Sequence, residues 1–151
     1  MDPSSFCILE RPKYPQNLAS AIRACACFGV QALIWTGDRF NLESMERTPR
    51  ETRMKAYASV RVIRSERPFD LLPSGIVPVC VELLPCSTPL PAFEHPRDAA
   101  YIFGPEDGDV SQVFRRFCHQ FVHIPSQHCL NLAAAMNVIL YDQMCKRTIG
   151  A

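Results

Sequence analysis

Residues 123–131, with the sequence H-I-P-S-Q-H-C-L-N, form a compact polar segment between two apolar runs. Pro125 cannot donate to a strand ladder and restricts the residue before it, so the strand expected over residues 121–124 ends there. Asn131 is a good N-cap for the helix that follows, whose apolar stripe comprises Leu132, Ala135, Met136, Ile139 and Leu140. Main-chain amides at a helix N-terminus can hold a small ligand with polar or anionic groups. The alternative is an ordinary strand-to-helix connection.

Two more segments follow expected strand ends, at Val81 and Phe103. Ligands of open α/β sheets bind beyond the carboxyl ends of the strands, so neighbouring strands would bring all three segments into one pocket. The turn G-P-E-D-G at residues 104–108 is not a G-x-G-x-x-G fingerprint, and the chain has no G-K-[ST] or G-x-S-x-G sequence. These absences argue against a standard dinucleotide, nucleoside-triphosphate or serine-hydrolase site. The histidines and cysteines between residues 118 and 129 match no common zinc spacing, so no metal is expected.

Arginine supplies the candidate contacts to a phosphate backbone. Arg23 lies in a helix-like run among small residues, which let another backbone or a ligand approach closely. Seven cations fall within residues 47–67, namely Arg47, Arg50, Arg53, Lys55, Arg61, Arg64 and Arg67. Two interpretations of this stretch stay open: a phosphate-contacting surface, or a solvated helix and loop whose charges are partly offset by Glu51 and Glu66.

The composition is typical of a globular domain. The 151 residues suffice for a substantial core, and 48% of them are hydrophobic while 21% are charged. The formal net charge of +1 gives no global attraction for nucleic acid, so an RNA site requires local clustering. The eight cysteines form no C-x-x-C pair and the chain starts M-D-P-S, which favours a reduced, cytoplasmic protein without a secretory leader. No apolar run approaches membrane-spanning length.

Strand-like and helix-like runs alternate along the chain. Strands are expected over residues 5–9, 32–35, 60–63, 76–81, 99–103 and 121–124, and helices over residues 17–29, 111–117 and from Asn131 onwards. Gly29 and Gly150 are placed to end the first and last helices. The alternation predicts an α/β fold with a mainly parallel sheet flanked by helices. No composition break marks a linker, so residues 1–151 are expected to form a single domain.

Three blocks of the chain resemble the signature motifs of the SpoU/TrmH branch of the SPOUT methyltransferases. They are P-Q-N-L-A-S-A-I-R-A-C-A-C-F-G-V (residues 15–30), Y-I-F-G-P-E-D-G (residues 101–108) and H-I-P-S-Q-H-C-L-N-L-A-A-A (residues 123–135). The blocks occur in the family's order at family-like intervals, and the similarity extends over nearly the whole chain.

The resemblance implies a fold, a cofactor and partners. The C-terminal part of such domains forms a deep trefoil knot, whose loops bind S-adenosylmethionine, and members are homodimers with the active site near the subunit interface. This branch mostly methylates the ribose 2′-hydroxyl of RNA. We therefore expect a minimal single-domain RNA ribose 2′-O-methyltransferase. The favoured substrate is tRNA, since the chain lacks the extra RNA-binding domain of many relatives. The alternatives are an rRNA methyltransferase and a non-catalytic dimer that binds RNA or cofactor.

The resemblance also assigns residues. Catalytic roles fall to Asn17, Arg23, Glu106 and Asn131. Arg23 is expected to position the ribose and its phosphate, because a free guanidinium stays protonated and is a poor base; alternatively it is a surface arginine at a dimer contact. Glu106 either orients Arg23 or stabilises its own turn. The expected RNA-binding residues are Arg23, Arg47, Arg50 and Arg53, and the expected cofactor-binding residues are Glu82, Leu83, Phe103, Gly104, Pro105, Gly108, Ile124, Pro125, Cys129, Leu130 and Asn131.

The chain departs from the family pattern at three places. Cys129 replaces the serine that often precedes the L-N pair, and a thiol is a weaker hydrogen-bond partner than a hydroxyl. The segment from Ile124 to Asn131 is shorter than in many relatives, and Asp109-Val110 replaces the more common G-L. Cys129 and the short segment favour the non-catalytic alternative, whereas the intact Asn17, Arg23, Glu106 and Asn131 oppose it.

Overall fold

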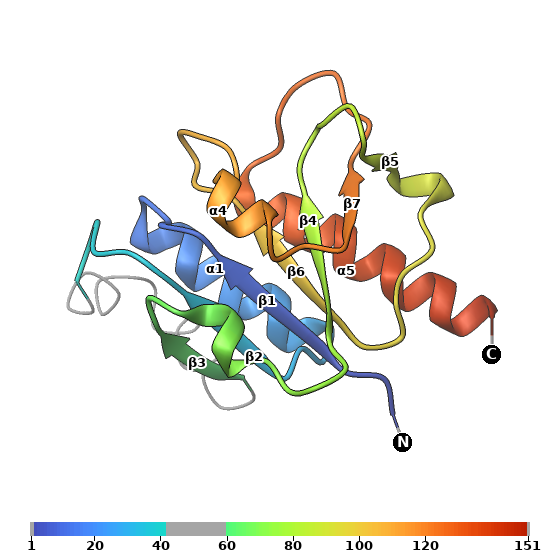
Figure 1. The fold of residues 1–151 in the computed structure, drawn as a ribbon, viewed down its shortest axis with the longest axis horizontal. Helices are drawn as coiled ribbons and strands as arrows, with labels where there is room; N and C mark the ends of the chain where they lie inside the picture. Colours follow the sequence, from blue (N-terminus) through green and yellow to red (C-terminus); the bar gives the residue numbers. More distant parts are fainter. Residues whose placement is uncertain (1, 42–59, 151) are drawn as a thin grey trace.

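The computed structural model describes residues 2–41 and 60–150, which build a seven-stranded sheet in the order β3-β2-β1-β6-β4-β7-β5 (Figure 1). Every paired strand in the sheet is parallel to its neighbour. The strands are β1 (Ser5–Leu9), β2 (Ala32–Trp35), β3 (Arg61–Arg64), β4 (Val77–Val81), β5 (Thr88–Pro89), β6 (Ala99–Phe103) and β7 (Gln120–His123). The helices are α1 (Pro15–Cys27), α4 (Gln112–Arg115) and α5 (Leu132–Ile149), with the 3-10 helices η1 (Pro68–Leu71) and η2 (Leu90–Ala92). The predicted α/β fold with a mainly parallel sheet is confirmed.

The element boundaries follow local chemistry closely. The six predicted strands are all present, with ends shifted by one residue at most, whereas the two-residue strand β5 was not predicted. Helix α1 begins at Pro15, two residues earlier than expected, because the fixed φ of proline suits the first helical position. Gly29 follows the helix with φ +68°, the left-handed conformation that commonly ends a helix at glycine.

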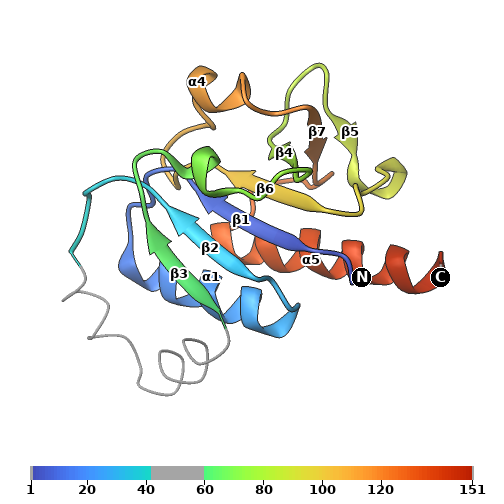
Figure 2. The ribbon, with the colours of Figure 1, turned by 60° about the horizontal axis from the view of Figure 1, so that its bottom comes forward.

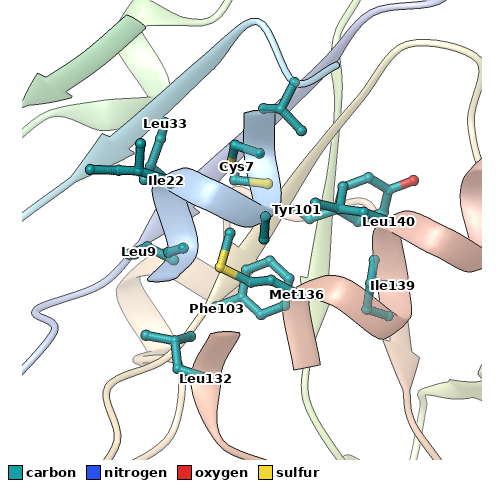
Figure 3. Close-up of a cluster of buried hydrophobic side chains, with 14 of the residues drawn as sticks. Cys7, Leu9, Ile22, Leu33, Tyr101, Phe103, Leu132, Met136, Ile139 and Leu140 are labelled. Atoms are coloured by element: carbon teal, nitrogen blue, oxygen red, sulfur yellow. The ribbon is translucent and has the colours of Figure 1, made fainter. Parts of the chain in front are cut away.

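Two layers of helix cover the sheet. Helices α1 and α5 lie on one face, and α4 and η1 lie on the other (Figure 2). Side chains alternate along each strand, so Cys7 and Leu9 of β1 join the cluster under α1 and α5 while Ile8 joins the cluster on the opposite face. Ile22 of α1 and Met136 of α5 both belong to the first of these clusters (Figure 3). Both faces of the central strands are therefore buried, as parallel sheets require.

A buried hydrogen-bonded network joins His95, in the segment before β6, to helix α5. The hydroxyl of Tyr101 accepts a hydrogen bond from Gln143 Nε2 at 2.7 Å and lies 2.7 Å from His95 Nδ1. His95 Nε2 lies 2.7 Å from Asp142 Oδ2, which also pairs with Lys146 Nζ at 2.8 Å. Because the Tyr101 oxygen accepts from Gln143, its own proton is available for Nδ1 of a neutral His95, which then donates from Nε2 to Asp142.

Several sequence predictions concern features outside these elements. None of the helices in the described ranges is both long enough and apolar enough to span a membrane. All eight cysteines are free thiols. Arg47, Arg50 and Arg53 lie outside the described residues, so their assignment to an RNA surface stays a prediction, as does the single domain over residues 1–151.

Candidate functional site

A cavity of about 620 Å³ opens beyond the carboxyl ends of β6, β4 and β7. These three strands are neighbours in the sheet, so the loops that follow them lie together, at the upper edge of the molecule in Figure 1. The start of α5 closes the cavity through Leu132 and Ala135. The order of the strands therefore brings the three loops together into one pocket, as predicted.

The predicted cofactor-binding residues gather around this cavity. All of them except Asn131 line it: Glu82, Leu83, Phe103, Gly104, Pro105, Gly108, Ile124, Pro125, Cys129 and Leu130. The lining also contains residues that the sequence analysis did not assign to the cofactor, namely Val81, Asp109, His123, Ser126, Gln127, His128, Leu132 and Ala135. Their position within or beside the same loops could have identified them. The cofactor contacts of the predicted residues stay predictions.

Two carboxylates from strand ends hold the loop after β6. Glu82 Oε1 accepts a hydrogen bond from the amide of Val110 at 2.8 Å, and Glu10 Oε1 accepts one from the amide of Ser111 at 2.7 Å. Burial raises the pKa of Glu82, against the hydrogen bond from Val110, which lowers it. Glu82 thus fixes the loop while remaining part of the cavity wall.

Gly104 is required by the packing of its own loop. A Cβ built on this residue would lie 2.7 Å from the amide nitrogen of Val110 and 2.8 Å from the carbonyl carbon of Asp109. The absence of a side chain at Gly104 therefore lets the loop fold back on itself. A missing side chain can also let a ligand approach the main chain, and for Gly104 that second role stays a prediction.

Glu106, Asn17 and Asn131 form one hydrogen-bonded chain across three distant segments. Glu106 accepts from the Asn17 side chain at 2.8 Å and from the amides of Lys13 and Tyr14 at 2.9 and 3.0 Å. Asn17 Oδ1 in turn accepts from Asn131 Nδ2 at 3.2 Å. Asn131 also caps α5, because its Oδ1 accepts from the amides of Ala133 and Ala134. One asparagine therefore joins the start of α5 to the start of α1.

The hydrogen bonds to Glu106 keep it ionised. Burial alone would raise the pKa of this carboxyl, but the donors from Asn17, Lys13 and Tyr14 outweigh burial, and the net effect lowers it. A carboxylate with three donors and a lowered pKa is a poor proton acceptor. Within one chain Glu106 holds the start of α1, and the described residues show no contact between Glu106 and Arg23.

Arg23 occupies an exposed position on α1 and lines neither the large cavity nor its smaller neighbour. It lies six positions after Asn17, about 9 Å along the helix axis, so the two predicted catalytic residues of this helix do not meet at one point.

A second, smaller cavity of about 410 Å³ adjoins the first. Its walls are Tyr14, Gln16, Asn17, Glu106, Leu130, Asn131 and Leu132, of which Glu106, Leu130 and Leu132 also border the large cavity. Asn131, which the sequence assigned to the cofactor, therefore lines this second cavity.

Near the second cavity, Asp107 binds Arg39 through two short hydrogen bonds of 2.6 and 2.8 Å, and this pairing lowers the pKa of Asp107 to about 2.

The ligand groups of the site suit an organic cofactor. No cluster of three or more histidine, cysteine or acidic side chains that could hold a metal ion occurs among residues 2–41 and 60–150. The large cavity combines apolar side chains such as Phe103 and Leu132 with exposed loop residues, among them Cys129. A parallel sheet with such a cavity beyond its strand ends defines an α/β ligand-binding domain.

The chain belongs to the SpoU rRNA Methylase family, whose model matches residues 4–141. This confirms the resemblance to SpoU/TrmH methyltransferases. A search of curated proteins finds no match.

Solved structures share the fold at low sequence identity. The SpoU methyltransferase AviRb from Streptomyces viridochromogenes, in complex with AdoMet, has a TM-score of 0.83 at 22% identity over 98% of this chain and 59% of that chain. A structure described as giving insights into the 2-OH methylation of C/U34 on tRNA has a TM-score of 0.80 at 22% identity and covers 97% of both chains. The TrmH/SpoU tRNA modifying enzyme of A. aeolicus has a TM-score of 0.78 at 16% identity over 99% of this chain and 78% of that chain. The present chain thus spans about three fifths of the length of AviRb.

Proposed function

We propose that this protein is an S-adenosylmethionine-dependent RNA methyltransferase that modifies the ribose 2′-hydroxyl. The observation that carries the proposal is the meeting of three separate sequence motifs around one pair of adjoining cavities. Glu106, Asn17 and Asn131 come from three different motifs and are hydrogen-bonded to one another at the junction of these cavities. Membership of the SpoU family and the AdoMet complex of the structurally similar AviRb support the choice of cofactor.

The walls of the large cavity fit S-adenosylmethionine. Phe103, Leu130 and Leu132 offer apolar surface for an adenine ring, and the loops after β4, β6 and β7 bring main-chain groups to the same space. Glu82 adds a carboxylate suited to a ligand that carries positive charge. When bound, the cofactor supplies a methyl group already activated by the neighbouring sulfonium.

The residues of the chain then have three tasks in the transfer. A ribose oxygen must be aligned with the methyl group, its proton must pass to solvent as the new carbon–oxygen bond forms and the carbon–sulfur bond of the donor breaks, and other water must be kept from the methyl group. Asn17 and Asn131 hold the junction of the cavities rigid through their mutual hydrogen bond. Arg23 positions the ribose and its phosphate, because a guanidinium binds phosphate oxygens in a fork and stays charged.

The proposal includes a homodimer in which Arg23 serves the neighbouring copy. Arg23 is exposed on α1 and lines neither cavity of its own chain. On the adjacent helix α5, Val138, Tyr141 and Met144 are exposed at helical spacing, and Tyr141 packs edge-on against Phe28 with ring centroids 6.3 Å apart. This apolar stripe on the α1 and α5 face suits burial against a second copy.

We extend the proposal to the C-terminal trefoil knot. Family membership supports it, together with the insertion of β7 between β4 and β5 and the return of α5 to the side of α1. Threading is tested by pulling the chain from its two ends in a single-molecule experiment. A knotted chain extends to a shorter contour length than an unknotted chain of 151 residues, and full extension to the unknotted length would exclude the knot.

The proposed substrate is tRNA. The structure described in connection with C/U34 methylation on tRNA supports this choice, since it matches the present chain over 97% of both lengths. An rRNA substrate is the runner-up, in line with the family's name. The exposed thiol of Cys129 and the short third-motif loop favour a third possibility, a dimer that binds RNA or cofactor without transferring the methyl group.

A methyl-transfer assay with labelled cofactor separates these possibilities. Total tRNA and rRNA from cells lacking the gene are incubated separately with the wild-type protein, and cofactor binding is measured in parallel by calorimetry. Label in the tRNA fraction supports the proposal, and label confined to rRNA supports the runner-up. Cofactor binding without label in either RNA would favour the non-catalytic dimer.

A further inference from the structure

We propose that the smaller cavity receives the nucleotide to be modified and that the ring of Tyr14 is the surface on which its base stacks. The inference rests on the proposed function, because it concerns how the same site would take its RNA substrate. It adds a binding residue that none of the three motif assignments contains.

The position of the cavity is the first argument. It adjoins the proposed cofactor cavity and shares Glu106, Leu130 and Leu132 with it, so a ligand in one cavity lies next to a ligand in the other. A group transfer between two molecules requires such contact. The volume of about 410 Å³ falls within the range of roughly 300–1,000 Å³ that is usual for small-molecule sites.

Tyr14 presents an exposed aromatic ring on a fixed backbone. Its side chain lines the cavity and the residue is 47% exposed. Its amide donates to Glu106 Oε2 at 3.0 Å, and its carbonyl accepts from the amide of Asn17 at 3.1 Å. In the described part of the chain the ring has no stacked or edge-on aromatic neighbour. An exposed aromatic ring on a hydrogen-bonded backbone, free of aromatic neighbours, suits a nucleobase, because every base has a π-face.

The remaining walls complement a ribose and a phosphate. Asn17 and Asn131 each use one N–H of their side-chain amide within the network, which leaves the second N–H of each for a ligand. Gln16 adds a further amide to the same wall. Lys13 Nζ lies over the Tyr14 ring, 5.3 Å from its centroid, and 3.8 Å from Asp107 Oδ2, which places a cation at one face of the ring. An aromatic face, amide donors and an adjacent cation together match a nucleotide.

The test compares Tyr14→Leu, which removes the π-face, with Tyr14→Phe, which keeps it. Phe117→Leu is the matched control, since Phe117 is 49% exposed and lies on the opposite side of the sheet, stacked on Phe69. Each protein is saturated with S-adenosylhomocysteine and titrated with AMP, CMP, GMP and UMP by saturation-transfer NMR. The KM for tRNA, kcat and the cofactor Kd are measured on the same preparations.

Tyr14→Leu is expected to weaken nucleotide binding and raise the KM for tRNA about tenfold or more, with the cofactor Kd unchanged, because one base–aromatic stack is lost. Tyr14→Phe and Phe117→Leu should behave as the wild type. Wild-type nucleotide binding and KM in Tyr14→Leu, or equal loss in Tyr14→Phe, would overturn the inference.

The nucleotide titration also keeps the inference separate from the proposed function. If the wild-type protein methylates no RNA yet loses nucleotide binding on Tyr14→Leu, the proposed reaction fails while the stacking site stands. If methylation proceeds equally well in Tyr14→Leu, the stacking site fails while the proposed reaction stands.

Discussion

Arg23 differs from the other predicted catalytic residues in its surroundings. Asn17, Glu106 and Asn131 are joined by hydrogen bonds, whereas Arg23 stands exposed on α1 and away from that chain of contacts. A residue in this position can act on a substrate without shaping the cofactor cavity. Its substitution should therefore separate catalysis from cofactor binding.

Arg23→Ala is expected to abolish methyl transfer, a loss of at least a hundredfold, while the Kd for S-adenosylmethionine stays within about twofold of the wild type. The reason is that Arg23 lines neither cavity of its own chain. Single-turnover transfer and isothermal calorimetry measure the two quantities, with Arg116→Ala as a surface control, since Arg116 is exposed and lies outside the basic stretch 47–67. Parallel loss of transfer and cofactor affinity would show that Arg23 supports the cavity instead.

Asn131 has two roles that a pair of substitutions can separate. Asn131→Ala removes both the cap of α5 and the hydrogen bond to Asn17, and should lower the free energy of unfolding by about 1 kcal/mol. Asn131→Ser keeps an oxygen for the cap but is too short to replace the amide bond to Asn17. We expect Asn131→Ser to retain stability in urea unfolding and to lose transfer. Full transfer activity in the serine variant would remove the link to Asn17 from the mechanism.

At the scale of elements, the loop after β6 depends on a glycine that permits its close return. Gly104→Ala should lower the free energy of unfolding by roughly 1–3 kcal/mol, since a Cβ there meets the amide of Val110 at 2.7 Å. Gly108→Ala is the matched control for stability, because its Cβ would meet only the Pro105 ring at an ordinary 3.5 Å. Denaturant midpoints of the two variants compare them directly. Equal midpoints would mean that the loop relaxes at no cost.

The segment after β5 is tied to α5 by a histidine whose protonation should weaken the fold. Burial lowers the pKa of His95, against the opposing effect of Asp142, while Lys146 and Arg147 lower it further. A histidine whose pKa is lowered in the folded state binds protons more readily when unfolded. Its contribution to stability is therefore present above its ordinary pKa of about 6.5 and is lost as the pH falls below that value.

Urea unfolding of the wild type and of His95→Gln at several pH values between about 7.5 and 5 tests this expectation. The wild-type midpoint should fall on acidification, and the fall should be smaller in the variant. The groups facing His95 are Tyr101, Asp142 and Lys146, none of which has an ordinary pKa inside this range. Identical pH profiles for the two proteins would show that His95 carries no such linkage.

Local sequence signals predicted the helices and strands better than they predicted the contacts between them. Pro125, Asn131 and Gly29 mark boundaries through their own backbone chemistry, so the ends of β7, α5 and α1 could be predicted closely. The hydrogen bond between Glu106 and Asn17 joins residues 89 positions apart, and no local sequence pattern predicts it. The packing requirement at Gly104 likewise depends on how its loop folds back onto Val110.

At the scale of the whole molecule, the α1 and α5 face should determine whether the protein is active. Tyr141→Glu places a charge in the exposed apolar stripe and is expected to convert a dimer to a folded monomer that has lost transfer. Sedimentation velocity measures the oligomeric state, and circular dichroism checks that the fold is kept. A wild-type monomer, or an active Tyr141→Glu monomer, would contradict the shared site.

Mixing two inactive variants tests whether one active site uses residues from both subunits. In a dimer of Arg23→Ala with Asn131→Ser, one of the two sites combines an intact Arg23 from one subunit with an intact Asn131 from the other. Random exchange should then restore about a quarter of wild-type transfer. No recovery after exchange would place Arg23 and Asn131 in the same subunit's site.

The proposed function is tested most directly by identifying the group in RNA that receives the methyl. The measurement is mass spectrometry of nucleosides from tRNA that has been incubated with the protein and S-adenosylmethionine carrying a deuterated methyl group. We expect a deuterated 2′-O-methylnucleoside that is absent from reactions with Arg23→Ala. A label found only on a base, or no label in RNA although the cofactor binds, would contradict the proposed function.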